Sequence, residues 1–495
     1  MKRVTINPIT RLEGHGKIEI FLDEQGNVAN TYFQVPELRG FEQFCVGRPA
    51  EDMPVITSRI CGVCPEAHHM AATKALDQVF GVEPPPAAKK IRELFYTAFY
   101  VTDHTTHFYA LGGPDFIVGP DAPPAERNLL GVVKKVGIDI GKQVMNCRAR
   151  NHHVIQMLGG RAIHPVAGVP GGWSRPVTEA ERAEIEAIAE QNVEFALFTL
   201  QLFDKIVLGN PAYLDLVNSD VYHHRTYSMG TVDAENRLNL YDGKIRVVDP
   251  EGCELLKYDA CDYASHVAER VEPWTYLKFP YLKRVGWKGF VDGAESGVYT
   301  ATPLSRLNVS DRMATQRAQE QFVRFYETLG SKKIGARYEP QHHRLATHWA
   351  RLIELLYAAE RMKELAADPE IASPQIRNIP DHIAGVGVGS VEAPRGTLTH
   401  HYVTDEKGIL QRVNMIVGTT NNYAAMSMSI KKAAEKLIRG GQIVEEGLLN
   451  RIEMAFRLYD PCLSCATHSL PGAMPLIVNI KNHQGEVLQS LRKDE

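Results

Sequence analysis

The sequence predicts one mostly helical domain of the α+β class, in which the strands form small sheets and hairpins. Three observations support this prediction. Residues 87–111 and 180–209 carry apolar side chains at helical spacing. Residues 217–300 are rich in β-branched, aromatic and glycine residues, which is typical of short strands and loops. No repeat, low-complexity linker or change of composition divides the 495 residues.

The composition narrows the class of protein further. An apolar fraction of 44% with 23% charged residues is typical of a globular protein with a large core. The formal net charge is only −4, and no basic block is interleaved with aromatic residues, so nucleic acid is not an expected partner. The first twenty residues contain no apolar secretory segment, and no long apolar run follows, so no membrane span is expected. Eight cysteines are too few for a disulfide scaffold, which favours a cytoplasmic protein.

The first predicted elements are two strands, residues 17–23 and 28–35, joined by a glycine-containing hairpin loop. The pattern then becomes helical, and three prolines at 84–86 suit the start of the first long helix. Thr178 and Glu181 form a capping box before the second long helix. The second half of that helix is apolar on nearly all sides, so we expect it in the middle of the core.

Further helices are predicted at 305–330, 340–367 and 424–457, with a hairpin centred on residues 405–408. The glycines in residues 385–390 lack the spacing of a dinucleotide-binding loop, and we interpret them as a turn. No phosphate-binding loop occurs. We therefore expect no nicotinamide or nucleotide site on this chain, and any such cofactor would bind to a partner.

Two C-x-x-C pairs stand near opposite ends of the chain. Cys61 and Cys64 lie in "SRICGVCPEAHH", and Cys462 and Cys465 lie in "DPCLSCATH". One such pair alone fits a redox dithiol, half of a zinc site or part of a cluster site. A zinc ribbon keeps its pairs within about twenty residues of each other, and a redox dithiol needs a βαβ setting. Four thiolates flanked by Arg, His, Asp and Pro favour a soft, redox-active metal, while zinc and incidental buried cysteines stay open.

These motifs, R-x-C-G-x-C-x-x-x-H and D-P-C-x-x-C-x-x-H, resemble those of the large subunit of nickel–iron hydrogenases. The resemblance covers nearly the whole chain and includes "PITRLEGHGKIEI" from Pro8 and "EAPRGTL" from Glu392. Within that family, "DHTTHFYALGGPDFIVGP" and "PWTYLKFPYLKRVGWKG" are similar to the cytoplasmic, multi-subunit group. The likeness is greatest to the methyl-viologen-reducing type that works with heterodisulfide reductase. The implied fold packs long helices around a buried metal site.

The resemblance implies a nickel–iron centre that cleaves dihydrogen heterolytically and reversibly. Cys61 and Cys462 would be terminal ligands of nickel. Cys64 and Cys465 would bridge nickel to an iron that carries carbon monoxide and two cyanides. Thiolates are soft donors and suit both metals. The electrons would pass to an iron–sulfur small subunit, and then to further electron-transfer subunits, among which heterodisulfide reductase is one candidate.

The same resemblance gives roles to five polar residues. Glu13 would be the first carboxylate of a proton relay, and Arg395 would lie over the metals. Asp103 and Asp460 would hold Arg395 in place, and His68 would hydrogen-bond a bridging sulfur. Taken alone, such residues also fit turns, paired arginines, solvated acids and core histidines.

Thr419 and Pro394 would contact the cofactor, with the Thr419 hydroxyl donating to an iron-bound cyanide. Glu42, the backbone carbonyl of Leu398, and His468 would bind magnesium near the carboxy terminus. A carboxylate and a carbonyl suit magnesium, whereas histidine is an unusual ligand for it. The last assignment therefore depends wholly on the resemblance.

The other four cysteines, Cys45, Cys147, Cys253 and Cys261, match no ligand position. We interpret them as free buried thiols. No cysteine group is left for an iron–sulfur cluster of the chain's own, and no flavin site is expected, so the electron relay belongs to partner subunits.

The resemblance divides the chain into a catalytic domain, residues 1–468, and an extension, residues 469–495. A maturation endopeptidase would remove the extension by cutting between His468 and Ser469 after nickel is inserted. Taken alone, the extension predicts a permanent hairpin around residues 481–485. While attached, it is expected to keep residues 460–468 near the surface.

Two other functions compete with the hydrogenase. One is a metal-free relative in the quinone module of a respiratory complex, against which the presence of all four ligand cysteines argues. The other is a structural zinc protein that acts as an assembly module. Elemental analysis distinguishes the three, because they would hold nickel with iron, no metal, or zinc alone.

Overall fold

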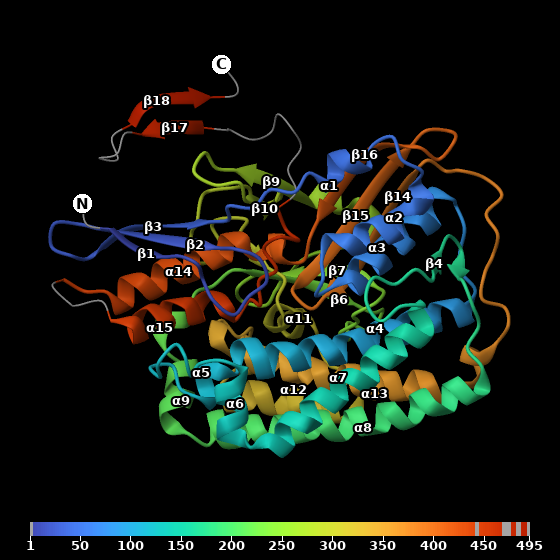
Figure 1. The fold of residues 1–495 in the computed structure, drawn as a ribbon, viewed down its shortest axis with the longest axis horizontal. Coiled ribbons are helices and arrows are strands. Elements are labelled where there is room, and N and C mark those ends of the chain that lie inside the picture. Colours follow the sequence, from blue (N-terminus) through green and yellow to red (C-terminus); the bar gives the residue numbers. More distant parts are fainter. Residues whose placement is uncertain (1–2, 441–444, 468–476, 482–486, 493–495) are drawn as a thin grey trace.

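A computed structural model describes residues 3–440, 445–467, 477–481 and 487–492 of the chain. It confirms the mostly helical α+β fold: long helices form one layer and small sheets lie on the other side (Figure 1). The predicted N-terminal hairpin is present as β2 (Lys17–Leu22) and β3 (Val28–Gln34), with β1 (Arg3–Ile6) paired antiparallel to β2. Helix α14 (Tyr423–Leu437) packs against β3 and against α15 (Glu446–Arg457).

The helical layer has α13 (Thr347–Ala367) at its centre. This helix packs against α4 (Pro86–Thr106), α8 (Glu179–Phe203) and α12 (Gln316–Thr328), and α4 packs in turn against α7 (Ile138–Gly159). Helix α4 starts at the predicted prolines, and the capping box at the start of α8 is formed. The layer is thus built from long helices whose starts are marked in the sequence.

The central position predicted for the second half of α8 is wrong. Glu194 and Gln201 are exposed, and Leu197 and Leu202 are only partly buried, so this helix lies at the edge of the layer. Helix α13 takes the central place because it combines apolar residues with small alanines on nearly every side. The polar residues of α8 recur at helical spacing and mark an outer face.

The predicted strand region contains two sheets. Strands β6 (Tyr227–Val232), β7 (Lys244–Val248), β8 (Glu254–Tyr258) and β11 (Tyr299–Thr300) form one sheet in the order β11-β6-β7-β8. Strands β9 (Val267–Val271) and β10 (Lys278–Leu282) form a separate antiparallel pair. Helix α11 (Pro303–Val309) packs on β6 and links this region to the helical layer.

A third sheet positions the functional site. Its strands are β14 (Val386–Ala393), β15 (Gly396–Thr404) and β16 (Leu410–Ile416), all antiparallel, and β15 and β16 form the hairpin that the sequence predicts. The turn predicted at residues 385–390 is wrong, because this stretch is the start of β14. Helix α3 (Pro65–Val79) lies directly across that strand.

The glycines of β14 have a packing reason. A Cβ added at Gly387 would lie 2.1 Å from the carbonyl oxygen of Ala75, and one at Gly389 would lie 2.0 Å from that of Ala71. Only glycine allows the backbone of α3 to approach the strand so closely. The pattern thus marks helix-on-strand contact and not a nucleotide loop.

Replacing Gly389 with alanine should lower the free energy of unfolding by about 3 kcal/mol, since the added methyl group meets backbone that cannot move aside. The apparent midpoint of thermal unfolding measures this. Gly40→Ala is the matched control, because a Cβ there meets nothing within 4 Å. Equal midpoints for the two variants would contradict the packing argument.

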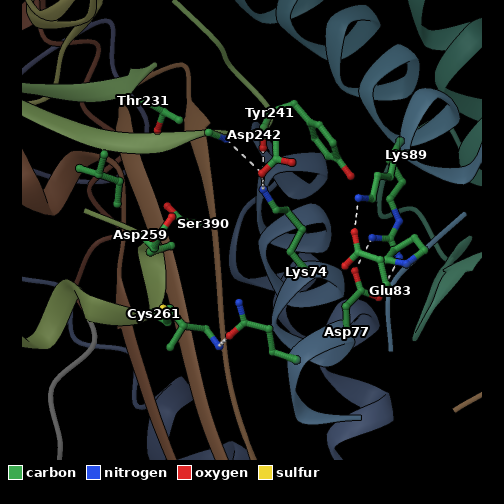
Figure 2. Close-up of a pocket in the computed structure, with 17 residues that line it drawn as sticks. Lys74, Asp77, Glu83, Lys89, Thr231, Tyr241, Asp242, Asp259, Cys261 and Ser390 are labelled. Atoms are coloured by element: carbon green, nitrogen blue, oxygen red, sulfur yellow. Dashed lines mark hydrogen bonds and ion pairs between the residues drawn. The ribbon is translucent and has the colours of Figure 1, made fainter. Parts of the chain in front are cut away.

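The far end of α3 is also tied down (Figure 2). The ammonium of Lys74 donates to the carbonyl of Tyr241 at 2.7 Å and to Asp242 at 3.1 Å. Asp77, one turn further along α3, accepts two hydrogen bonds from the buried Arg92 of α4. Helix α3, which begins just after Cys64, is therefore fixed to both layers.

The shorter elements complete the fold. They are α1 (Phe41–Cys45), α2 (Met53–Thr57), α5 (Pro114–Ile117), α6 (Leu129–Val136), α9 (Pro211–Val217), α10 (Tyr263–His266), β4 (Gly168–Val169), β5 (Gly172–Trp173), β12 (Lys333–Ile334) and β13 (Arg337–Tyr338). The predicted C-terminal hairpin is confirmed as β17 (Ile477–Lys481) and β18 (Val487–Arg492). Among the described residues, no helix has the length and apolar character needed to cross a lipid bilayer.

Candidate metal centre

The two ends of the chain meet at the cysteine pairs. Cys61 follows the 3-10 turn Ser58–Ile60, and Cys64 directly precedes α3. Cys462 and Cys465 lie in the turn after α15, where Cys462 forms a parallel bridge with Glu13. The amide of Leu463 donates to the carbonyl of Glu13 at 3.0 Å. The N-terminal loop thus holds the C-terminal cysteines against α3.

All four sulfur atoms lie in one buried cluster, within 4.8 Å of one another. The Sγ atoms of Cys61 and Cys462 are 3.3 Å apart, those of Cys64 and Cys465 are 3.9 Å apart, and those of Cys462 and Cys465 are 2.7 Å apart. The described residues contain no other group of three or more potential ligands at such distances. The cluster has the donor set of a site for soft metals.

The pKa values of the cysteine thiols are shifted in different directions. Burial raises the pKa of Cys462 and of Cys465 well above the ordinary value for a thiol. Burial acts on Cys61 as well, but hydrogen bonds from the neighbouring thiols outweigh it and lower the pKa of Cys61. A cation is needed to bring all four into the thiolate form, which is the form that binds metals.

Arg395 lies beside this cluster, between two acids. Its Nη1 is 3.0 Å from Asp103 Oδ1, and its Nη2 is 3.0 Å from Asp460 Oδ2. Burial works against the charge of Asp460, yet Arg395 and then His107 lower the pKa of this carboxyl below its ordinary value. The guanidinium is buried and is held as a fixed charge.

The sequence did not point to the residues that support this arrangement. His107 Nδ1 lies 3.1 Å from Asp460 Oδ1, and Arg351 lies 3.4 Å from Asp460 Oδ2. The carbonyl of Pro394 accepts from Arg351 at 3.1 Å and from Arg306 at 3.2 Å. The spacing of four between Asp103 and His107 is one signal that they share a helix face.

Glu13 is in contact with the cluster. Its Oε2 accepts from the thiol of Cys462 at 3.0 Å and from the amide of Ser464 at 3.2 Å. The hydroxyl of Ser464 donates to its other carboxylate oxygen. Ser464 was not singled out from the sequence, although it stands between the two cysteines of "CLSC". A carboxylate that touches a buried thiol and reaches towards the surface can move protons.

Two other predicted residues are hydrogen-bonded to the backbone of cluster cysteines, and the first of them, His68, donates its amide to the carbonyl of Cys64 at 3.5 Å. His68 Nδ1 is 3.1 Å from His400 Nε2, and His400 Nδ1 is 2.6 Å from the hydroxyl of Tyr402. Thr419 Oγ1 accepts from the amide of Cys462 at 3.1 Å. His400 and Tyr402 lie in the hairpin of β15 and β16, far from His68 in sequence, and only tertiary structure brings them together.

The predicted magnesium ligands are partly described. Glu42 is fully buried, and its Oε1 accepts from the amide of Met415 at 2.8 Å. Its Oε2 has no hydrogen-bond partner among the described residues, and burial raises the pKa of this carboxyl to about 7. Leu398 is buried on β15, and His468 lies outside the described residues. An unsatisfied buried carboxylate oxygen fits a cation site.

Two predictions about other parts of the chain are wrong. Cys253 and Cys261 were expected to be buried, but both are exposed because they lie near the ends of the short strand β8, whereas Cys45 and Cys147 are buried as expected.

Residues 460–467 are buried while β17 and β18 are still attached. The carbonyl of Thr467 accepts from the amide of Arg39 at 3.0 Å. The bulk of the extension therefore does not hold this segment at the surface.

The fold and the cluster together define a redox metalloprotein with a buried four-thiolate centre. The sequence matches the family described as nickel-dependent hydrogenase over residues 39–129 and 295–468. It is 50% identical to an F420-non-reducing hydrogenase iron-sulfur subunit of Archaeoglobus profundus, covering 99% of this chain and 100% of the relative. It is 41% identical to an F420-non-reducing hydrogenase subunit of Methanothermobacter thermautotrophicus, covering 99% and 100%.

The structure is similar to a crystal structure of an NAD+-reducing [NiFe]-hydrogenase in the H2-reduced state. The TM-score is 0.86 and the identity 36%, covering 94% of this chain and all of the other. The chain therefore belongs to the nickel-dependent hydrogenase family, as the catalytic large subunit of a nickel–iron hydrogenase that oxidises dihydrogen. This role implies that its partner is a small iron–sulfur subunit, and it sets aside the zinc and metal-free alternatives.

Proposed function

We propose that this subunit cleaves dihydrogen at a nickel–iron centre held by the four cysteines, with Cys61 and Cys462 on nickel and Cys64 and Cys465 shared with iron. The observation that carries the proposal is the convergence of four buried sulfurs with Glu13 and Arg395 at one cluster. When bound, the centre supplies an open coordination position for dihydrogen and accepts its electrons. Carbon monoxide and two cyanides on iron would lie near Thr419 and Pro394.

The proton leaves through Glu13. Its Oε2 accepts from the thiol of Cys462, so it is placed to take a proton from that sulfur, while the hydroxyl of Ser464 donates to the other carboxylate oxygen and holds the group in place. Glu13 itself is partly exposed, and the next residues of its loop lead to the surface. The contact with Cys462 and the partial exposure of Glu13 support its assignment as the first carboxylate of the proton relay.

Glu13→Gln should lower dihydrogen oxidation and deuterium–proton exchange by about 10²-fold or more, because an amide cannot take up the proton. Both rates are measured on the enzyme complex, with nickel content determined in parallel. Glu24→Gln, an exposed acid in the hairpin loop, is the matched control. An unimpaired exchange rate in the Glu13 variant would remove this residue from the relay.

Arg395 acts as a fixed charge over the metals, positioned by Asp103 and Asp460. Each acid contacts one Nη atom of the planar guanidinium, so both the position and the orientation of this group are fixed. His68, one turn after Cys64 on α3, would tune the centre when the metals are bound. Glu42, the backbone carbonyl of Leu398 and His468 would hold magnesium. The Glu42 oxygen that has no hydrogen-bond partner among the described residues supports this site.

The small subunit docks over the centre. The stretch of sequence that contains the first cysteine pair has several exposed apolar residues, namely Leu38, Phe44, Val46, Val55 and Val63. Such residues are typical of a face that a partner covers. The nearby Cys61 and Cys64 would then lie within reach of the partner's first iron–sulfur cluster.

The large subunit purified without its partner should show no dihydrogen-dependent reduction of a protein acceptor, since the four remaining cysteines are scattered and form no cluster site. Adding the small subunit should restore the activity. Full turnover by the isolated large subunit would contradict the division of labour.

Beyond the small subunit, we place this enzyme with the F420-non-reducing hydrogenases that it resembles. It would work in the cytoplasm, with further electron-transfer subunits and heterodisulfide reductase as the candidate acceptor. We also propose that residues 469–495 are removed by a maturation endopeptidase, which leaves residues 1–468 as the mature catalytic domain.

The decisive experiment is anaerobic purification of the complex followed by elemental analysis and an assay with methyl viologen. We expect one nickel and one iron in each large subunit, beyond the iron of the small subunit, and dihydrogen-dependent reduction of the dye. Zinc alone, or no metal in a well-folded complex, would overturn the proposal.

A further inference from the structure

Helix α6 and the first half of α7 leave several apolar side chains exposed at the surface of the helical layer. The eight residues of α6 read "LLGVVKKV", yet only Val132 is buried. Leu130 is 79% exposed and Ile138 is 66% exposed. Apolar helices of this kind are stable in a soluble protein when another surface covers them.

A groove runs between α6, α7 and the π-helical turn η3 (His107–Gly112). It encloses about 300 Å³ and its walls are mostly apolar, formed by Tyr109, Leu129, Val133, Val136, Ile140 and Val144. Met145, at its edge, is 57% exposed. The groove is large enough for one or two apolar side chains.

The two helices that flank the groove carry four cations without an ion pair among the described residues. Lys134, Lys135, Arg148 and Arg150 make no ion pair within the part of the chain that the structure describes. Arg148 lines the groove, and its Nε is buried there without a hydrogen-bond partner. Asp139 is the only acid between residues 127 and 164, in a chain whose net charge is −4.

The polar cavity beside α3 differs from this groove in how its charges are paired (Figure 2). It encloses about 220 Å³. Its cations are paired with acids of the same cavity: Lys74 with Asp242, Lys89 with Glu83 and Arg92 with Asp77. That cavity pairs all three of its cations. In the groove of α6 and α7, Lys142 pairs with Asp139 at 3.6 Å, whereas Arg148 has no ion pair within the described residues.

We propose that this groove docks an acidic amphipathic segment of a second partner protein, distinct from the iron–sulfur small subunit. Apolar side chains of the segment would fill the groove, and its carboxylates would pair with Lys134, Lys135 and Arg148. A second copy of this chain fits poorly, since a two-fold interface would bring the same cations together. Figure 1 places α6 at the opposite side of the molecule from α1 and α2, which adjoin the proposed small-subunit face.

Photo-crosslinking on the intact complex tests the proposal. A benzoylphenylalanine at Leu130 should crosslink to a segment rich in Asp and Glu, with apolar residues at helical spacing, in a subunit other than the small subunit. The same group at Ile379, which is 73% exposed, is the control position and should not capture that segment. A crosslink to the small subunit, a crosslink to a second copy of this chain, or none at all overturns the proposal.

Charge reversal gives an independent measurement. Lys134→Glu with Lys135→Glu should weaken retention of the crosslinked subunit by about tenfold, and raising the salt concentration should weaken retention in the parent complex as well. Lys333→Glu with Lys407→Glu changes two other exposed, unpaired lysines and should have no effect. Equal retention in both double variants overturns the proposal. Dihydrogen-dependent dye reduction, measured in the same preparations, reports the hydrogenase function separately.

Discussion

Replacing Arg395 with lysine is expected to lower dihydrogen oxidation by about 10³-fold while nickel stays bound. Arg395 makes two separate 3.0 Å contacts, one with Asp103 of α4 and one with Asp460 beside the second cysteine pair. A lysine ammonium is a point charge on a flexible chain and cannot hold both acids in the same geometry. The charge would remain in the pocket, but its direction over the metals would be lost.

The test needs two measurements on the same sample: dihydrogen oxidation with methyl viologen, and nickel content. Arg92→Lys is the matched control, because Arg92 is also buried and also holds an acid with two hydrogen bonds. Its partner, Asp77, lies at the end of α3 that is far from the cysteines. We expect Arg92→Lys to lower stability and to leave the rate per nickel intact. Loss of nickel from the Arg395 variant would instead assign this residue a structural role.

The sequence predicted what depends on short-range pattern. The hairpin of β2 and β3, the prolines at the start of α4 and the capping box of α8 are each encoded within a few residues, and all three are present. The cysteine pairs were found because metal binding needs fixed local spacing. Their convergence followed from the family resemblance, since no local pattern states which distant segments meet.

The misses depend on tertiary contacts. Gly387 and Gly389 have the composition of a turn, and only the approach of α3 explains why they belong in a strand. The second half of α8 is apolar enough for the core. However, α13 occupies the centre, because its small residues allow neighbouring helices to pack closely on more sides. Burial of a helix is decided by its neighbours as well as by its own sequence.

The charge network around Arg395 shows the same limit. His107, Arg306, Arg351 and Glu354 look like ordinary helix residues in the sequence, but all four are buried and support the segment carrying Arg395. Arg306 pairs with Glu354 and Arg351 with Asp460, while His107, whose pKa burial lowers to about 4, lies 3.1 Å from Asp460. Buried charges of this kind are costly unless each has a partner. Besides the spacing of four between Asp103 and His107, the presence of several arginines and histidines on apolar helices is a sequence signal for such a network.

The extension gives a prediction about maturation. Intact mass should show a chain ending at His468 in active enzyme, and a chain that still carries residues 469–495 in nickel-starved cells. Metal binding and folding are coupled at such sites, because the ligands must lose protons and come together. Active, nickel-loaded protein that keeps the extension would contradict this prediction.

A stop codon after His468 should give a protein with less than about a tenth of the normal nickel content. Within the described part of the chain, the closed packing of residues 460–467 rests on hydrogen bonds from residues before the extension: Arg39 donates to the carbonyl of Thr467, Thr420 to that of Ala466, and Cys462 to Thr419. A chain without residues 469–495 has everything it needs to close, and closure buries all four sulfurs before metal enters.

Because the attached extension does not block closure by its bulk, we expect it to act as the site that maturation proteins bind while they hold the segment open. The control is a short tag added after Glu495, which leaves the extension in place and should leave nickel content unchanged. Full nickel loading of the truncated chain would show that insertion does not depend on the extension.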